Sequence, residues 1–128
     1  MNKKILIVDD EKDIVDIMSM FLNEEGYYIT CAYNGLEALE KVNCIKPDLI
    51  VLDIMMPRMD GFTVNQKLKE NPDTRDIPVI VVTGKNDLRK IEEAIKKDQI
   101  NSYIKKPFTM TELLEKTKDL FSSKESYA

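Results

Sequence analysis

Four short apolar runs, each followed at once by polar side chains, constrain this sequence most. Three of them are four residues long and rich in β-branched side chains, which is typical of strands buried on both faces of a sheet. In a parallel sheet the carboxyl ends of the strands lie along one edge, where α/β proteins build their sites. We therefore expect the polar side chains after the runs to meet in one cluster. The runs cover residues 5–8, 49–52, 79–82 and 103–104, and they are followed by Asp9 and Asp10, Asp53, Thr83, and Lys105 and Lys106.

Helical patterns fill the segments between the runs. The first is an amphipathic stretch whose apolar side chains recur every three or four residues, as one helix face requires, before Gly26 ends it. Asn34 with Glu37, and later Thr109 with Glu112, have the spacing of a capping box and predict where two further helices begin. The apolar face of the first helix comprises Ile14, Ile17, Met18, Phe21 and Leu22.

Together these patterns predict five strands that alternate with five helices. Such alternation is typical of an α/β fold in which right-handed crossovers join parallel strands and helices cover both faces. A length of 128 residues predicts one domain, which we place at residues 1–122, followed by a short polar tail at 123–128. The remaining strand covers residues 27–32, and the helices after the first cover roughly 35–43, 61–71, 87–97 and a last segment from 109.

Composition and charge exclude several classes of protein. A net charge of −4 argues against a nucleic-acid-binding surface, since such surfaces are usually basic. No apolar run approaches the ~20 residues that span a bilayer, and the first run stops at Val8, too early for a signal peptide. We therefore expect a cytoplasmic protein without direct contact with membrane or nucleic acid.

The two cysteines do not indicate a metal site. Cys31 and Cys44 form no CxxC pair, and the chain contains no histidine, so a zinc site is not expected. A cytosolic location also argues against a disulfide. The expected state is two free thiols, buried or half-buried.

The predicted cluster holds up to three carboxylates, from Asp9, Asp10 and Asp53. Like charges at short distances raise one another's pKa and destabilise the fold unless a cation offsets them. Oxygen ligands without histidine suit Mg²⁺, which prefers one or two carboxylates plus a phosphate. Lys105 or Lys106 adds a positive charge at the same edge.

A magnesium ion, a lysine and the Thr83 hydroxyl together favour the binding of a phosphoryl group. An aspartate beside them can act as nucleophile and form an acyl phosphate. Asp53 is the best candidate because it stands alone after the most central apolar run. In-line attack at phosphorus depends on position and charge more than on acid–base groups, so the lack of histidine is no obstacle.

Each of these residues has a simpler explanation when it is taken alone. The acids could cap a helix or stand in a loop, the threonine could belong to a turn, and the lysines could be solvated charges. Their coincidence at one edge of one sheet is what favours a functional site.

The motifs, taken in order, resemble those of response-regulator receiver domains, the phospho-accepting half of two-component signalling, in the manner of chemotaxis-regulator-like single-domain receivers. The resemblance covers residues 4–121. It implies a flavodoxin-like, doubly wound, five-stranded parallel sheet with strand order 2-1-3-4-5 and five helices, in three α/β/α layers. The matching segments are 5–11, 32–39, 47–57, 59–61, 77–80 with Thr83 and Gly84, and Tyr103 with 106–108.

The resemblance implies a metal and phosphate site. Asp53 would be the phosphoacceptor and one ligand of Mg²⁺. Asp10 would bind the ion directly and Asp9 mainly through water. The backbone carbonyl of Met55 would complete the protein ligands, and Lys106 would contact the phosphoryl group.

The resemblance also implies a switch. Thr83 would swing its hydroxyl toward the phosphate, and Tyr103 would change rotamer into the space vacated. The peptide bond between Lys106 and Pro107 is expected to be cis, although most X–Pro bonds are trans. These changes would carry the signal toward the surface formed by the fourth helix, the fifth strand and the fifth helix.

The implied function is that of a phosphoacceptor that is not an enzyme for other substrates and catalyses only its own phosphorylation and autodephosphorylation. The donor would be a histidine kinase or a histidine phosphotransfer protein. The downstream protein is not identified, and the chain would act as a monomer or as a phosphorylation-dependent dimer.

Alternatives remain open at this point. The chain could be a receiver domain excised from a larger transcription factor or hybrid kinase. It could also be a Mg²⁺-dependent phosphohydrolase with an aspartyl phosphate, but such enzymes commonly place a second acid two residues after the nucleophile, where this chain has Met55. A nucleotide-binding protein of similar topology would need a glycine-rich loop after the first strand.

The chain departs from the family pattern near the end of the fourth helix and around the phosphate. Gln99 and Ile100 replace the Gly-Ala that the family commonly has before the fifth strand. Met55 and Lys85 occupy positions that vary in the family and tune dephosphorylation. A bulky Met55 would shield the acyl phosphate from water.

Overall fold

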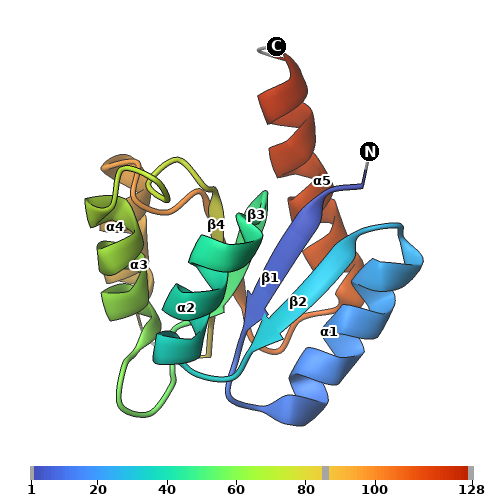
Figure 1. Ribbon diagram of the computed structural model, residues 1–128, viewed down its shortest axis with the longest axis horizontal. Coiled ribbons are helices and arrows are strands. Elements are labelled where there is room, and N and C mark those ends of the chain that lie inside the picture. The colour runs from blue at the N-terminus through green and yellow to red at the C-terminus, as the bar shows by residue number, and fades with distance from the viewer. Residues whose placement is uncertain (1, 85–86, 127–128) are drawn as a thin grey trace.

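Five parallel strands form a single sheet with the order β2-β1-β3-β4-β5 (Figure 1). The computed structural model describes residues 2–84 and 87–126, with side chains described as far as residue 122. The observed order confirms the predicted doubly wound sheet. The strands are β1 (Lys4–Val8), β2 (Tyr28–Ala32), β3 (Leu49–Asp53), β4 (Val79–Thr83) and β5 (Ser102–Lys105).

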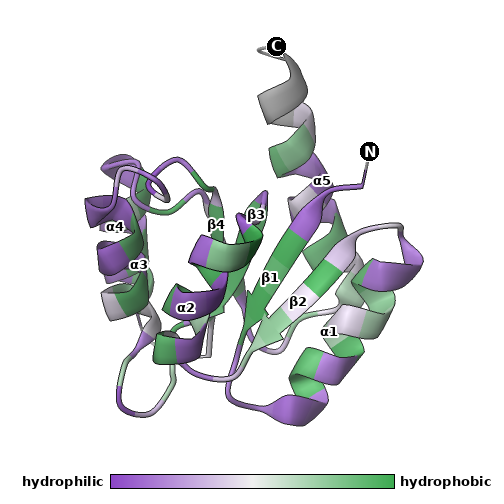
Figure 2. Cartoon of the chain, viewed as in Figure 1, coloured by the Kyte–Doolittle hydropathy of each residue, from purple (hydrophilic) through white to green (hydrophobic). Residues whose placement is uncertain are grey.

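Five helices cover the sheet and complete three layers. Side chains of α1 and α5 share one core with the sheet, and those of α2, α3 and α4 share the other. Successive strand residues alternate between the two cores, because side chains in a strand point to opposite faces: Leu6 belongs to one and Ile7 to the other. Figure 2 shows the resulting hydrophobic sheet between helices with hydrophilic outer faces. The helices are α1 (Lys12–Glu24), α2 (Gly35–Ile45), α3 (Gly61–Glu70), α4 (Leu88–Lys96) and α5 (Met110–Ser126).

Two helices begin at the predicted caps, with one difference in bonding. Asn34 Oδ1 accepts a hydrogen bond from the backbone N–H of Glu37 at 2.8 Å, and Thr109 Oγ1 accepts one from the N–H of Glu112 at 3.1 Å. The Glu37 carboxylate accepts from the N–H of Tyr33 at 2.5 Å. That donor belongs to the residue before the cap, so the reciprocal bond of a capping box is displaced by one residue.

Two side chains are more exposed than the sequence pattern predicts. Ile17 is assigned by periodicity to the buried face of α1, but it is 54% exposed. That face contains Val15 and Met18 instead, which leaves Ile17 at its margin. Both cysteines are free thiols, and Cys31 is half-buried as predicted, whereas Cys44 is exposed.

The last helix is longer than the sequence pattern predicts. It continues through Ser126, beyond residue 122, where we place the end of the domain. Leu113, Thr117 and Phe121 are buried, as the pattern predicts. Within the residues that the structure describes, no helix is both long and apolar enough to cross a membrane.

Candidate functional site

The register of the sheet brings the predicted site residues to one edge. Asp53 lies opposite Val82, and Thr83 lies opposite Lys105, in adjacent parallel ladders. Asp9 directly follows β1, the neighbour of β3 on its other side. The segments that follow four of the five strands therefore converge, as the sequence predicts for parallel strands.

Glycine allows α3 to begin close to this edge. A Cβ atom at Gly61 would lie 2.5 Å from the backbone oxygen of Asp53 and 2.8 Å from the Cα of Ile54. No larger residue fits at that distance without a shift of the backbone.

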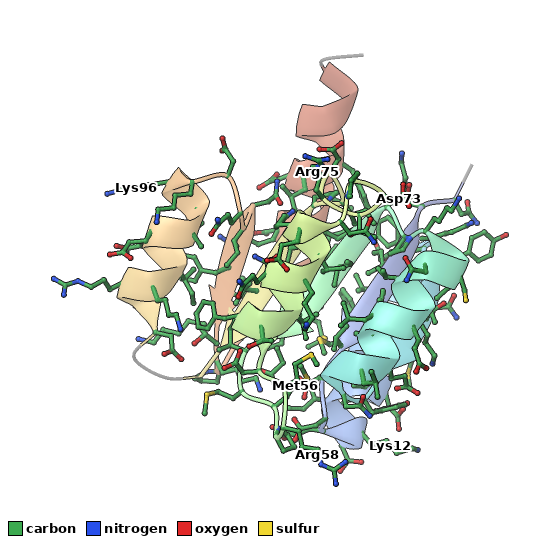
Figure 3. The ribbon with its side chains drawn as sticks, turned by 60° about the vertical axis from the view of Figure 1, so that its left-hand side comes forward. Lys12, Met56, Arg58, Asp73, Arg75 and Lys96 are labelled. Atoms are coloured by element: carbon green, nitrogen blue, oxygen red, sulfur yellow. The ribbon has the colours of Figure 1, made fainter. Side chains whose placement is uncertain are left out.

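The segments that follow β1 and β3 lie at the same end of the molecule, as Lys12 and Arg58 show in Figure 3.

Three carboxylates meet at the edge, and two of them are buried. Asp9 and Asp53 are each 1% exposed, whereas Asp10 is exposed. One oxygen from each residue lies within 4.8 Å of the others. Within the described part of the chain, the Oδ2 atoms of Asp9 and Asp53 are buried without a hydrogen-bond partner, which is a costly arrangement.

This donor set fits a magnesium ion. Carboxylate oxygens at short mutual distance are the ligands that Mg²⁺ prefers, and the two unpartnered oxygens are atoms that a cation would satisfy. The sequence-predicted ligands Asp9, Asp10 and Asp53 are therefore brought together by the fold.

Lys106 is the lysine of the cluster. Its Nζ lies 3.6 Å from Asp53 Oδ1, 3.7 Å from Glu11 Oε1 and 3.9 Å from Asp9 Oδ2. All three distances exceed those of ordinary hydrogen bonds, so the ammonium group is shared among the acids instead of being bound to one. Lys105, the other lysine that the sequence offered, is exposed.

Burial dominates the electrostatics of the two inner acids. It raises the pKa of Asp53 to about 7, with a further increase from the charge of Asp9, and Lys106 offsets only part of this. Burial is also the main reason that the pKa of Asp9 is raised. Without a cation, the cluster therefore holds protons near neutral pH, and a divalent cation would favour the ionised form.

The predicted switch residues lie on β4 and β5, the two strands on one side of β3. Thr83 is fully buried at the end of β4, and its carbonyl oxygen accepts a hydrogen bond from the N–H of Lys106 at 2.7 Å. The bond between Lys106 and Pro107 is cis, as expected. Tyr103 is half-buried in β5 and packs against the core beneath α4, with Lys116 Nζ 5.9 Å from its ring centroid.

The variable positions near the site are only partly described. Met55 is 46% exposed, and its backbone N–H points toward Asp53 Oδ1 at 3.4 Å. Lys85 lies outside the described residues. In the loop that departs from the family pattern, the N–H of Gln99 donates to the Ala94 carbonyl at 2.8 Å, and Ile100 is buried.

Two residues matter at the site although the sequence pattern did not single them out. Glu11 is the third acid in the run after β1 and shares Lys106 with the two buried aspartates. Gly61 permits the close approach of α3. The sequence could have indicated Gly61 by its position directly after Asp60. The Asp60 side chain caps α3 by accepting a hydrogen bond from the N–H of Thr63 at 2.8 Å.

The fold and the site together define a class: a doubly wound α/β protein that gathers acids, a hydroxyl and a lysine at the carboxyl edge of its sheet. The response regulator receiver domain family matches residues 5–118, and the chain belongs to this family. Receiver domains are signalling phosphoacceptors that bind Mg²⁺ at an acidic pocket and interact with histidine kinases and downstream effectors.

Known proteins similar to this chain include regulators of several kinds. The DNA-binding dual master transcriptional regulator RpaA of Synechocystis sp. is 37% identical over 119 residues, which are 91% of this chain but 48% of RpaA. The chain thus spans about half the length of that curated relative.

Solved structures show the same similarity. The N-terminal domain of a response regulator receiver protein from Methanoculleus marisnigri JR1 is 40% identical with a TM-score of 0.76, covering 91% of this chain and 94% of that one. The chemotaxis protein CheY4 of Vibrio cholerae is 28% identical with a TM-score of 0.85, covering 93% and 98%.

Proposed function

We propose that the chain is a phospho-accepting response regulator in which Asp53 receives a phosphoryl group. The observation that supports this most is the placement of a buried carboxylate whose Oδ1 lies 3.6 Å from Lys106 Nζ and whose Oδ2 has no hydrogen-bond partner among the described residues. One oxygen of this carboxylate can bind the cation, and the other is then available as the nucleophile. The lysine can neutralise charge on the transferred group.

In this proposal Asp10, Asp53 and the Met55 backbone carbonyl hold Mg²⁺, with Asp9 acting mainly through water. When bound, the ion supplies positive charge to the phosphoryl oxygens. The ionised Asp53 carboxylate attacks the phosphorus and forms a new O–P bond, while the bond from phosphorus to the donor's imidazole nitrogen breaks and the imidazole leaves. Lys106 moves from its shared position to the phosphoryl oxygens. The burial of Asp53 limits the access of water, and Met55 extends that shield.

The resulting acyl phosphate would bias a switch. A phosphoryl group adds about two negative charges and three acceptor oxygens, and the Thr83 hydroxyl turns toward them. Tyr103 then moves inward, because it already packs at the margin of the core beneath α4. The arrangement of α4, β5 and α5 that binds the downstream protein becomes the more populated one.

The donor would be a histidine kinase or a histidine phosphotransfer protein. A hollow of about 530 Å³ opens beside the site and contains Lys106 and Glu11 together with apolar side chains. Ile17, exposed by 54%, lies in it. An apolar surface next to the reactive group suits a protein donor, which must bring its phosphohistidine to Asp53.

Further parts of the proposal concern the chain as a whole. The receiver occupies residues 1–122 and works in the cytoplasm. It binds an unidentified downstream protein as a monomer or as a phosphorylation-dependent dimer. It has no substrate other than its own phosphoryl donor.

Intact-mass measurement after treatment with acetyl phosphate and Mg²⁺ tests this proposal. The parent should gain one phosphoryl group, Asp53→Asn should gain none, and Asp13→Asn, which removes an exposed acid of α1, should behave as the parent. Equal gain by Asp53→Asn would overturn the assignment. Sustained release of phosphate from small phosphate esters would instead favour a phosphohydrolase.

A further inference from the structure

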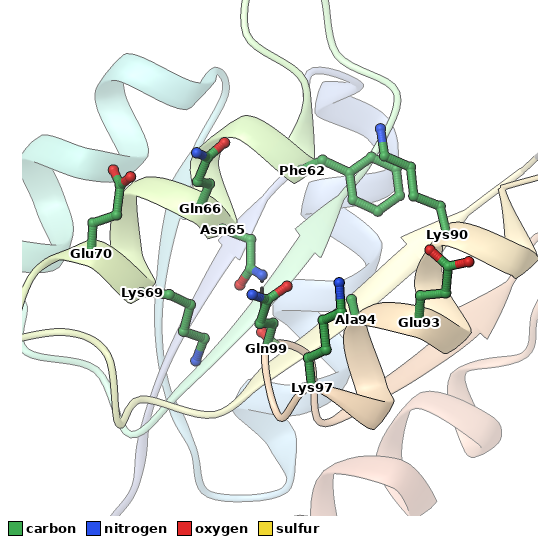
Figure 4. A pocket seen from close by; sticks show the side chains of 10 residues that line it. All are labelled: Phe62, Asn65, Gln66, Lys69, Glu70, Lys90, Glu93, Ala94, Lys97 and Gln99. Atoms are coloured by element: carbon green, nitrogen blue, oxygen red, sulfur yellow. Dashed lines mark hydrogen bonds between the residues drawn. The ribbon is translucent and has the colours of Figure 1, made fainter.

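A groove runs between α3 and α4, and no residue of the acidic cluster lines it. It encloses about 510 Å³, a volume within the usual range of small-molecule sites. The α3 wall presents side chains at the spacing of one helix face, and the α4 wall presents a second such row (Figure 4). The groove is lined by Phe62, Asn65, Gln66, Lys69, Glu70, Lys90, Glu93, Ala94, Lys97 and Gln99.

The floor of the groove contains an amide with an unused acceptor. Asn65 is 5% exposed, and its Nδ2 donates to the backbone carbonyl of Gln99 at 2.9 Å. That bond fixes the amide orientation, because only the nitrogen can donate. Asn65 Oδ1 is left buried without a partner within the described residues, a costly state that an N–H or O–H donor from a ligand would relieve.

The side chain of Gln99 lies close to this acceptor (Figure 4). Gln99 is exposed and stands next to Asn65 at the groove (Figure 4). We infer that a ligand reaches the Asn65 oxygen after this exposed, flexible side chain rotates. Its own amide then offers one donor and one acceptor beside the Asn65 oxygen.

The lining of the groove contains three lysines, Lys69, Lys90 and Lys97, and two glutamates, Glu70 and Glu93. Lys90 on α4 and Lys97 at the C-cap of this helix lie seven residues apart, about 10 Å along the helix axis, with Glu93 between them. Lys90 Nζ lies 4.2 Å from the centroid of the Phe62 ring, so an aromatic face and a positive charge occur together. Lys69 is already engaged, since its Nζ donates to the carbonyl oxygens of two loop residues.

We propose that this groove binds an adenine nucleotide of monophosphate size. Asparagine and glutamine amides recognise adenine through its amino group and the adjacent ring nitrogen, which is the pairing that Asn65 Oδ1 and the Gln99 amide offer. The phosphate lies at Lys90 and Lys97, and Glu93 accepts from ribose hydroxyls. The Phe62 ring forms the apolar wall beside the base.

The helix that forms one wall can adapt to such a ligand. Ile91 is the one fully buried residue of α4, so few apolar contacts hold this helix in place. A nucleotide that bridges α3 and α4 would restrain it. Nucleotide binding does not require phosphorylation of Asp53, so it can be tested on the unphosphorylated chain.

Titration of the ¹⁵N-labelled chain with adenosine monophosphate, followed by amide NMR shifts, tests the proposal. Shifts should concentrate in α3, α4 and the loop at Gln99. Lys97→Glu should weaken binding at least tenfold, whereas Lys96→Glu, an exposed lysine of the same helix outside the groove, should bind within about twofold of the parent after allowance for its long-range charge. Gln99→Ala should weaken binding severalfold without loss of the fold.

Two further ligands separate a nucleotide site from a cluster of surface charges. Adenosine and inorganic phosphate should each bind at least tenfold more weakly than the monophosphate. Equal binding of inorganic phosphate, equal weakening by Lys96→Glu, or no groove shifts at millimolar nucleotide would overturn the proposal. Asp53→Asn should bind the nucleotide as the parent does, so failure of the phosphoacceptor assignment leaves this test unaffected.

Discussion

Asp53 is an ionisable residue whose burial opposes its charge, and this makes the stability of the protein depend on pH. The pKa of its carboxyl rises from 3.8 in an unperturbed chain to about 7 in the folded protein. Between these values the unfolded chain has lost the proton and the folded chain retains it. Stability therefore falls as pH rises from about 4 to 7.

Replacement of Asp53 by Asn removes this penalty. We expect Asp53→Asn to unfold at a higher urea concentration than the parent without Mg²⁺. The free energy of unfolding should be larger by on the order of 4 kcal/mol at and above neutral pH, because the pKa of Asp53 is raised from 3.8 to about 7 in the folded protein. The difference should shrink toward pH 4. A difference that is constant across this range would show that the change in packing, not ionisation, is responsible.

Glu11 should affect the reaction more than the stability. It is 59% exposed at its side chain and shares Lys106. In Glu11→Gln the lysine is freer to meet an incoming phosphate, and one charge that repels an anionic donor is removed, which at about 7 Å in water is about 0.6 kcal/mol or about threefold in rate. Phosphorylation by acetyl phosphate should accelerate by that factor.

Two controls accompany this experiment: a change of ionic strength, and the variant Asp13→Asn, which removes a different exposed acid. The acceleration in Glu11→Gln should diminish at high salt, because exposed charges are screened, and Asp13→Asn should show little acceleration. An unchanged rate in Glu11→Gln at low salt would contradict the idea that this carboxylate competes for Lys106.

At the scale of the elements, the contact between α3 and the end of β3 is the tightest near the site. Gly61→Ala places a methyl group 2.5 Å from the Asp53 backbone oxygen, so α3 must shift. We expect a loss of about 1–3 kcal/mol in the free energy of unfolding. Gly84→Ala is the matched control, because its nearest neighbour, Lys106 Cδ, is 3.6 Å away; a comparable loss there would argue against the steric explanation.

Elements of this protein could be predicted because local patterns specify them. The buried strands, the caps at Asn34 and Thr109, and the convergence of polar residues at one edge all follow from hydrophobic period and parallel pairing. The resemblance to receiver domains separated Lys106 from Lys105. Periodicity predicted that Ile17 is buried, and this was wrong. The spacing of apolar residues shows that a helix has an apolar face, but only the packing of the helix on the sheet determines which side chains at the margin of that face are buried.

Other features depend on tertiary structure. Glu11 and two buried aspartates share the ammonium group of Lys106. This arrangement depends on side-chain positions that the spacing of residues in the sequence does not predict. The unpaired oxygen of Asn65 likewise arises only where α3 meets the loop before β5. Neither has a signature in the sequence.

At the scale of the whole molecule, a cation should stabilise the fold. In the proposed function Mg²⁺ would bind the folded site and not the unfolded chain, so a 100-fold excess over its Kd should add about 2.7 kcal/mol to the free energy of unfolding and raise Tm. Asp10→Asn should lose most of this gain. An equal rise in Tm for this variant would place the ion elsewhere.

The two proposed sites should also be coupled through α4. If phosphorylation rearranges α4, nucleotide affinity at the groove must differ between the two forms, and the nucleotide must shift the phosphorylation equilibrium by the same factor. We expect the nucleotide affinity to change about fivefold on phosphorylation, which is near the lower end of typical allosteric coupling. NMR titration of the acetyl phosphate-treated chain measures it, and equal affinities would show that the sites are independent.

The sheet order has a consequence for how the chain folds. β1 and β3 bring the carboxylates together at the centre of the sheet, but Lys106 follows β5, the last strand to be synthesised and an outer one. A chain that ends before β5 would hold buried acids without their counter-charge. The final strand thus does more than extend the sheet: it brings the lysine that offsets part of the negative charge of the buried acids, so the site is complete only when the last strand has joined the sheet.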